Sequence, residues 1–388
     1  MCKKLLIAVT NRSSYNKIKP IVRALPNDVT PSFLLGGGVL LYRFGSIDAL
    51  IERDFPECDI HKVHLAVEGD DLGKMSKTVG LGIIEVSTLL DFVKPDAVLV
   101  CADRYETLAV SISASYKNIP LIHLQGGEHT GTIDDKVRNA NSVLADMHFP
   151  ATQRAGIRVS HLINSCDHIY PYGCPSMDIL LSNPDVECVI NRGGRGNIDT
   201  MASLIVKNTH VVNGKGKGDI IDCGNPYIIV MLHGDTTDKR FVSHMHQLTD
   251  ALDMVNTQKI IFWNNIDPKG DQIAKMWREY DCMDNHRFIR HLEPEDFAGV
   301  LLMSDCIVGN SSTGIREANF LGVPSVNIGD RQHGREHGSN VVTVPFNKGA
   351  IYDAIMGRRG MVCEPSNLYG DGNAGEMIAA RISYEINR

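Results

Sequence analysis

The sequence has no run of basic residues, no CxxC pair and no apolar stretch long enough to cross a membrane. Its 39 lysines and arginines are outnumbered by 46 aspartates and glutamates, and the formal net charge of -7 argues against nucleic acid as the main partner. The ten cysteines are scattered, so we predict no metal site and expect buried free thiols in a reducing compartment. The first apolar run covers only residues 5–9, too short for the core of a signal peptide, so a cytoplasmic location without membrane contact is predicted.

The residues that are present predict two domains of ordinary size. The chain has 388 residues, of which 43% are hydrophobic and 22% charged, as is usual for a soluble globular protein with a large core. Short apolar runs alternate with segments of helical periodicity, a pattern typical of parallel sheets covered by helices on both faces. Strands are predicted over residues 5–10, 32–35, 97–101 and 121–124, and in the second half over 227–232, 260–263, 306–308 and 325–328. Helices are predicted over 15–25, with Ser13 or Ser14 as its cap, 75–93 and 105–116.

We therefore predict an α/β fold of two doubly wound, Rossmann-like domains facing a cleft, with ligands bound at the carboxyl ends of the strands. Residues 1–178 would form the first domain, 179–368 the second, and 369–388 a C-terminal helix that packs back on the first. The stretch 191–224 is rich in glycine and basic residues. For this stretch a flexible surface insertion or hinge-side loop is favoured over a phosphate-binding loop.

The strongest chemical motif is VGNSSTGIRE, residues 308–317. An apolar strand leads into a turn and a helix pattern follows. Backbone N–H groups and two hydroxyls would thus face one ligand at the positive end of a helix. A diphosphate suits such a site, and Glu317 would accept hydrogen bonds from ribose hydroxyls. The alternative is a simple helix cap by Ser311 or Ser312. No GxGxxG turn follows the first strand, so no nicotinamide cofactor is expected.

Carboxylates gather after two strands of the first half. Asp103 follows the run 97–101, and Glu128, Asp134 and Asp135 follow the run 121–124 in HLQGGEHTGTIDDKVR. Parallel strands end at the same edge of a sheet, so these side chains would converge on one ligand. Mutual repulsion would then raise their pKa values toward that of a general base near neutrality. The alternative is that Asp134 or Asp135 only caps a helix.

Two cationic residues are placed in the same way. His233 follows the strand 227–231 and would bind a phosphate oxygen or move a proton, and a histidine without a catalytic role fits equally well. Arg12 follows the first strand and would neutralise a diphosphate, with an arginine in a solvated loop as the alternative.

Taken together, these segments resemble the hydrolysing UDP-N-acetylglucosamine 2-epimerase family, which includes the epimerase half of a bifunctional animal enzyme and its bacterial counterparts. The similarity covers nearly the whole chain. It is carried by NRSSY, ADRYETLA, HLQGGEHTGTIDDKVR, YGCPSMD and LHGDTTD, and most specifically by FWNNID, VGNSSTGIREANFLGVPSVNIGDRQHGREHGSNV and LYGDGNA.

The resemblance implies a two-domain fold like that of GT-B glycosyltransferases, no metal or other cofactor, and a nucleotide sugar as partner of a homodimer or homotetramer. It implies that UDP is eliminated from UDP-N-acetylglucosamine through a 2-acetamidoglucal, and that water then adds to give N-acetylmannosamine. The catalytic residues that it implies are Asp103, Asp134, Glu128, Gln125 and His233. The nucleotide-binding residues are Arg12, Asn264, Ser311, Ser312, Gly314, Glu317 and Arg331.

The chain departs from the family pattern at Gln125, where the animal enzyme has a glutamate, and at Asn139, where the family often has a histidine. A glutamine cannot take up a proton as a carboxylate does. Either Asp103, Glu128 or Asp134 therefore carries the proton transfer, or the substrate differs, for example a UDP- or GDP-linked diacetamido-trideoxyhexose. A glycosyltransferase of the same architecture and a non-catalytic nucleotide-sugar sensor are the further alternatives.

Overall fold

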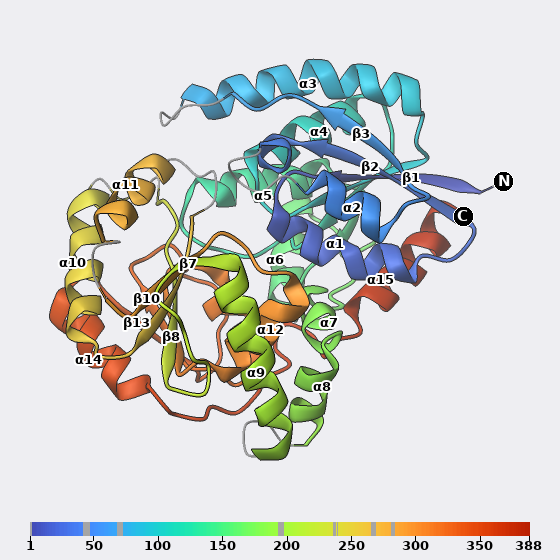
Figure 1. Cartoon of the computed structure of the whole chain (residues 1–388). Coiled ribbons are helices and arrows are strands. Elements are labelled where there is room, and N and C mark those ends of the chain that lie inside the picture. Colours follow the sequence, from blue (N-terminus) through green and yellow to red (C-terminus); the bar gives the residue numbers. More distant parts are fainter. Residues whose placement is uncertain are drawn as a thin grey trace. The chain divides into compact units, whose positions relative to one another are not determined.

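The computed structural model (Figure 1) divides the chain into two compact units. The first unit contains residues 1–128, 133–178 and 369–388, and the second contains 129–132 and 179–368. The residues that the structure describes are 2–41, 47–67, 73–192, 198–235, 238, 240–264, 269–280 and 284–388. Cys282 and the glycine-rich residues 193–197 lie outside them.

The first unit is built on a six-stranded parallel sheet of order β3-β2-β1-β4-β5-β6. This is the Rossmann order, and its direction reverses between β1 and β4, where doubly wound folds bind their ligands. The strands are β1 (Lys3–Val9), β2 (Val29–Gly36), β3 (Asp59–Val63), β4 (Ala97–Cys101), β5 (Leu121–Leu124) and β6 (Met147–Phe149).

Helices cover both faces of this sheet because its strands bury side chains on both sides. On one face, Leu5, Ile7 and Val9 of β1 pack with α1 (Arg12–Ala24) and α15 (Ala374–Ile386), which also contact each other. On the other face, Leu6 and Ala8 pack with α3 (Gly73–Val93) and α4 (Tyr105–Tyr116). The remaining helices are the 3-10 helix η1 (Gly37–Leu40), α2 (Asp48–Asp54), α5 (Ile133–Leu144), α6 (Gln153–Ile163) and α7 (Ser176–Leu181), which runs into the second unit.

The cap predicted for the first helix is wrong. Asn11, not Ser13 or Ser14, is the N-cap of α1, and its side chain accepts a hydrogen bond from the backbone N–H of Ser14 at 2.7 Å. The Ser14 hydroxyl in turn accepts a bond from the backbone N–H of Asn11, which completes a capping box. The helix therefore begins directly after β1, and Arg12 is its first residue rather than a residue of a solvated loop.

The second unit repeats the same strand order in a seven-stranded sheet, β13-β12-β11-β8-β9-β10-β7, in which only the edge strand β7 is antiparallel. Its reversal point lies between β8 and β11. The strands are β7 (Gly216–Gly218), β8 (Tyr227–Met231), β9 (Gln258–Phe262), β10 (His286–Ile289), β11 (Cys306–Gly309), β12 (Ser325–Ile328) and β13 (Val341–Val344). The helices are α8 (Pro184–Asn191), α9 (Ile198–Lys215), α10 (Phe241–Met254), α11 (Gly270–Tyr280), α12 (Pro294–Met303), η3 (Ser312–Gly314), α13 (Glu317–Phe320) and α14 (Lys348–Arg358).

The flexible loop predicted over residues 191–224 is wrong for residues 198–218, whereas residues 219–224 form no helix or strand. Residues 198–218 form α9 and the edge strand β7. Arg287 of β10 is the physical reason, because its buried guanidinium donates five hydrogen bonds to backbone carbonyls at the end of α9 and along β7. Burial lowers the pKa of this arginine. These bonds satisfy carbonyls that the end of a helix otherwise leaves without partners.

The predicted fold class is confirmed, since both units are Rossmann-like doubly wound domains. Within the described part of the chain, no helix is both long enough and apolar enough to cross a membrane. Of the described cysteines, Cys101, Cys174, Cys223, Cys306 and Cys363 are buried free thiols, whereas Cys2 and Cys166 are exposed.

Candidate active site

Arg12 and Asp103 lie at the reversal point of the first sheet. β1 and β4 are parallel neighbours, so both end at the same edge. Arg12 comes three residues after the end of β1, and Asp103 comes two residues after the end of β4. The structure thus brings the first predicted cation and the first predicted carboxylate to the edge where doubly wound sheets bind ligands.

The backbone beside Asp103 is held in a conformation that a residue with a side chain rarely adopts. Ala102 has a φ of 62°, in the left-handed region, which costs on the order of 1 kcal/mol or more. Its carbonyl accepts hydrogen bonds from His123 Nε2 at 2.9 Å and from Asn141 Nδ2 at 3.3 Å. These two buried side chains therefore fix the direction in which Asp103 leaves the strand.

His123 serves this purpose as a neutral ring. A carbonyl can only accept a hydrogen bond, so Nε2 carries the proton, and Nδ1 accepts a bond from the Ser142 hydroxyl at 3.0 Å. Burial lowers the pKa of His123 to about 4, which keeps the ring uncharged at neutral pH. The histidine of the HLQGGE segment is therefore part of the scaffold around Asp103.

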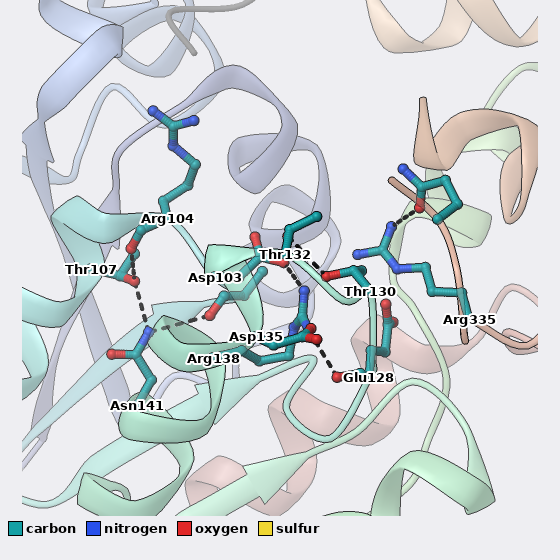
Figure 2. A network of polar contacts seen from close by, with 12 residues as sticks. Asp103, Arg104, Thr107, Glu128, Thr130, Thr132, Asp135, Arg138, Asn141 and Arg335 are labelled. Carbon is teal, nitrogen blue, oxygen red and sulfur yellow. Dashed lines mark hydrogen bonds and ion pairs between the residues drawn. The ribbon is translucent and has the colours of Figure 1, made fainter. Parts of the chain in front are cut away.

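Arg138 lies at the centre of the predicted carboxylate cluster (Figure 2). Its guanidinium forms ion pairs with Asp103 and Asp135 and donates to the backbone carbonyl of Glu128 at 2.8 Å. Burial by itself would lower the pKa of Arg138, but the carboxylates of Asp103, Glu128 and Asp135 raise it above its usual range. The sequence predicted that carboxylates gather at this edge. It did not predict that the Arg138 guanidinium lies between them and offsets their mutual repulsion.

Sequence reasoning missed Arg138, although a signal was present. Asp135 and Arg138 are three residues apart on α5, a spacing that places opposite charges on one face of a helix. Asp134 precedes this pair in the first turn of α5, where a negative charge is favourable at the helix N-terminus. Asp134 is half-buried, whereas Arg138 is 1% exposed.

Gln125 is buried in the first unit and has a positive φ of 61°. Its amide nitrogen donates a hydrogen bond to the sulfur of Cys174, which also contacts the Ser176 hydroxyl at 2.8 Å. The side chain that stands where the animal enzyme has a glutamate is therefore tied to the YGCPSMD segment.

Arg104 is a second cation that sequence reasoning did not single out. Its guanidinium forms two hydrogen bonds with the carboxylate of Glu106, at 3.0 and 3.2 Å. The Glu106 side chain is 1% exposed, while that of Arg104 is 15% exposed. The pairing fixes Arg104 directly after Asp103 at the carboxyl edge of β4.

In the second unit, His233 and Ser311 lie at the reversal point between β8 and β11. Asn310 connects the two strand ends: its Oδ1 accepts a bond from the backbone N–H of His233 at 2.8 Å, and its Nδ2 donates to the carbonyl of His233 at 2.9 Å. Gly309 is required just before it, because the glycine has a φ of 138° and an added Cβ would lie 2.0 Å from the carbonyl oxygen of Met231. The two predicted motifs VGNSSTGIRE and LHGDTTD are thus physically joined.

The helix predicted after Ser311 and Ser312 is short. Residues 312–314 form a single 3-10 turn and α13 covers only Glu317–Phe320, so Glu317 is the first residue of the helix. Gly322, with a φ of 67°, and Pro324 follow and end it. A helix of four residues contributes little dipole at this place, so the anion would be bound by individual N–H and hydroxyl groups.

Glu317 supports the prediction of a ribose-binding carboxylate in another way. Within the described residues, its Oε2 is a buried oxygen without a hydrogen-bond partner. A buried acceptor of this kind costs free energy unless a ligand or water supplies a donor. Ser311, in contrast, accepts a bond from the N–H of Thr313 at 3.3 Å, as in the alternative prediction of a simple cap.

Two further predicted residues follow β12 and β9. Arg331 donates to the backbone carbonyl of Asn310 at 3.1 Å, which brings it to the same edge as Ser311. Asn264 follows β9 and donates to the carbonyl of Gly270 at 3.1 Å. Lys269, which the sequence did not single out, donates to the carbonyls of Asp235 and Asp238, two described residues that follow His233.

A family model described as UDP-N-acetylglucosamine 2-epimerase matches residues 45–383. The chain belongs to the UDP-N-acetylglucosamine 2-epimerase family. The resemblance drawn from the sequence motifs is thereby confirmed.

Bacterial members of this family are similar to this chain over most of its length. A UDP-N,N'-diacetylbacillosamine 2-epimerase (hydrolyzing) from Legionella pneumophila is 30% identical over 385 residues, 97% of this chain and 94% of the relative. A UDP-N-acetylglucosamine 2-epimerase from Neisseria meningitidis serogroup B is 26% identical over 359 residues, 91% of this chain and 87% of the relative.

The crystal structure of a Neisseria meningitidis UDP-GlcNAc 2-epimerase bound to UDP-GlcNAc superimposes with a TM-score of 0.74 at 18% identity, over 98% of this chain and 99% of that one. At this identity the likeness concerns the fold. The roles of the individual side chains in this member of the family stay predictions.

Proposed function

We propose that the protein is a hydrolysing 2-epimerase that converts UDP-N-acetylglucosamine and water into N-acetylmannosamine and UDP. In the first step, a base removes the proton from C2 and the bond from C1 to the UDP oxygen breaks, which leaves 2-acetamidoglucal. In the second step, water gives its hydroxyl to C1 while a proton is added to C2 on the opposite face. No oxidant or reductant is consumed, in keeping with the expectation that no cofactor is needed.

The observation that carries the proposal is the position of Asp103 at the reversal point of the first sheet, oriented by Ala102 and paired with Arg138. An ion pair favours the charged form of a carboxylate, which is the form that accepts a proton. Asp134 and Glu128 would supply the acid or base of the second step. Gln125 would take part only by orienting the sugar, because it cannot exchange a proton.

The nucleotide would bind to the second unit. His233 and Arg331 would contact the diphosphate with Ser311, Ser312 and the backbone of Gly314, and Glu317 would accept hydrogen bonds from the ribose hydroxyls. This assignment is supported by the buried Oε2 of Glu317 and by the gathering of three loop ends at Asn310. Arg12 and Asn264 would complete the binding of the nucleotide.

Proton NMR with UDP-N-acetylglucosamine in deuterated water tests the reaction. We expect free N-acetylmannosamine, UDP, and deuterium at C2. The variants Asp103→Asn and Asp134→Asn should each lower turnover at least about a hundredfold, the usual scale for one acid–base group, with little change in UDP affinity.

Asp146→Asn is the matched control. Asp146 accepts a bond from the N–H of Leu121 at the opposite, amino-terminal end of β5, so its loss should leave turnover unchanged. Full activity of both the Asp103 and Asp134 variants would remove the carboxylate assignment. UDP binding without any turnover of nucleotide sugar would instead favour a sensor, and transfer of the sugar to an acceptor would favour a glycosyltransferase.

A diacetamido-trideoxyhexose is the second candidate sugar. The name of the Legionella pneumophila relative, which is 30% identical to this chain, supports it, as does Gln125. The same elimination and hydration would apply, since both sugars carry an acetamido group at C2. Parallel assays with UDP-N-acetylglucosamine and UDP-N,N'-diacetylbacillosamine at equal concentration decide between them by the ratio of kcat/KM. A homodimeric or homotetrameric state stays a prediction, as does the cytoplasmic location.

A further inference from the structure

Asn310 joins the three loops of the second unit that carry the proposed phosphate ligands. Its amide side chain forms the reciprocal pair of bonds with the backbone of His233, which follows β8. Its backbone carbonyl accepts bonds from Arg331 at 3.1 Å and from Gln332 at 2.8 Å, and both of these residues follow β12. Asn310 itself follows β11 and directly precedes Ser311.

The side chain of Asn310 is 1% exposed, and both its nitrogen and its oxygen already have partners in His233. It is therefore poorly placed to contact a ligand itself. β8 and β11 pair up to Met231 and Gly309. Beyond these residues, the Asn310 side chain forms two hydrogen bonds with the backbone of His233, as a neighbouring strand would.

The chemistry of this position requires an asparagine. An aspartate would turn the donating nitrogen into a second oxygen facing the carbonyl of His233, and an alanine would leave a buried N–H and a buried carbonyl without partners. A glutamine is one methylene longer, in a region where an added Cβ at Gly309 already has no room.

We propose that Asn310 is a positioning residue for the diphosphate: its side chain holds the backbone of His233 in the place from which His233 contacts the phosphate groups, beside the backbone carbonyl that receives Arg331. The inference rests on the proposed nucleotide-binding function of the same site. Substitution of Asn310 should therefore weaken binding of the diphosphate group, and it should leave binding of the nucleoside unchanged.

The test compares UDP with uridine as probes, with affinities measured by calorimetry and by ligand-observed NMR. Asn310→Ala and the isosteric Asn310→Asp should each weaken UDP binding by about tenfold or more, the scale of one lost hydrogen-bonded contact to a charged group. Uridine affinity should stay within about twofold of wild type.

Asn213 provides a matched control in the same unit. Its side-chain amide forms the same pair of hydrogen bonds with the backbone of Ile221: Nδ2 donates to the carbonyl at 2.8 Å, and Oδ1 accepts from the N–H at 3.0 Å. Asn213→Ala and Asn213→Asp should lower the Tm as the Asn310 variants do, but should leave the preference for UDP over uridine unchanged.

A double-variant cycle gives a second measure. If the Asn310 side chain acts by holding His233, Asn310→Ala should weaken UDP binding less in a His233→Ala background than in the wild type. Strictly additive effects, or Asn310 variants that lower the Tm while the preference for UDP persists, would overturn the inference and leave the proposed function intact. A wild-type protein that binds no UDP would overturn both.

Discussion

Two buried histidines make the first unit sensitive to acid, and this can be measured. His123 and His148 are register partners on β5 and β6, and they are 0% and 1% exposed. Burial lowers the pKa of each to about 4, from an ordinary value of about 6.5, and the neighbouring rings His148 and His168 lower them further.

The sign follows from proton binding. The unfolded chain takes up a proton on each histidine as the pH falls through about 6.5, whereas the folded state does so only near pH 4. The stability that the two neutral histidines contribute is therefore fully present above about pH 6.5, and it is lost as the pH falls toward about 4. The two pKa values correspond to a loss of about 3 kcal/mol per histidine, with a slope of up to about 1.4 kcal/mol per pH unit for each proton. A loss of this size is comparable to much of the stability of an ordinary domain.

The variant His148→Phe isolates one of the two groups. Phenylalanine has a similar ring and cannot be charged, and within the described residues Nδ1 of His148 has no hydrogen-bond partner to lose. Urea unfolding followed by circular dichroism should give wild type and variant curves of stability against pH that diverge below about pH 6.5, with the variant up to about 3 kcal/mol less acid-sensitive at pH 4.

The substitution His64→Gln, at an exposed position of the same unit, is the control and should reproduce the wild-type slope. Parallel curves for wild type and His148→Phe would refute the reasoning, because they would mean that His148 binds its proton equally well in the folded chain.

Two further predictions concern a structural arginine and one residue of the proposed active site. Arg287→Met should lower the free energy of unfolding by about 3 kcal/mol, because it removes five hydrogen bonds to backbone carbonyls, of which that to Val212 is buried and the others are partly buried. Hydrogen exchange should rise in residues 212–219 but not in α10, and unchanged exchange in 212–219 would contradict the role given to Arg287. Gln125→Glu should retain or raise turnover of UDP-N-acetylglucosamine, since the Cys174 thiol can donate to the new carboxylate where it now accepts from the amide. A loss of UDP release in a discontinuous chromatographic assay, with the Tm unchanged, would count against that view.

The sequence predicted best those strands and helices whose first and last residues are indicated by neighbouring residues in the sequence. The strands Ala97–Cys101, Leu121–Leu124 and Ser325–Ile328 and the helix Tyr105–Tyr116 have the predicted limits, because buried apolar runs end at polar or turn-forming residues. The edge strand Asp59–Val63 went unpredicted, since its sequence DIHKV is mostly polar and its pairing with β2 is a long-range event.

The errors have the same origin. α9 and β7 are held by Arg287, which lies about 70 residues further along the chain, and no local pattern of glycine and lysine indicates that contact. The ion pair between Arg138 and Asp103 likewise spans 35 residues. Sequence periodicity could place both side chains at one edge of a sheet, but only the folded structure reveals that a cation occupies the centre of the acidic cluster.

Both units stabilise their ligand edge in the same physical way, which bears on how they would bind a substrate. In the first unit the amide of Asn141 and the ring of His123 hold the backbone beside Asp103, and in the second the amide of Asn310 holds the backbone of His233. In each case a buried side chain without charge fixes the backbone just after the end of a strand. In both units the backbone at the end of the strand is thus held by uncharged groups. Ordering a flexible segment on binding costs conformational entropy. A strand end that is already fixed in this way should therefore bind its ligand at a smaller entropic cost than one that becomes ordered around the ligand.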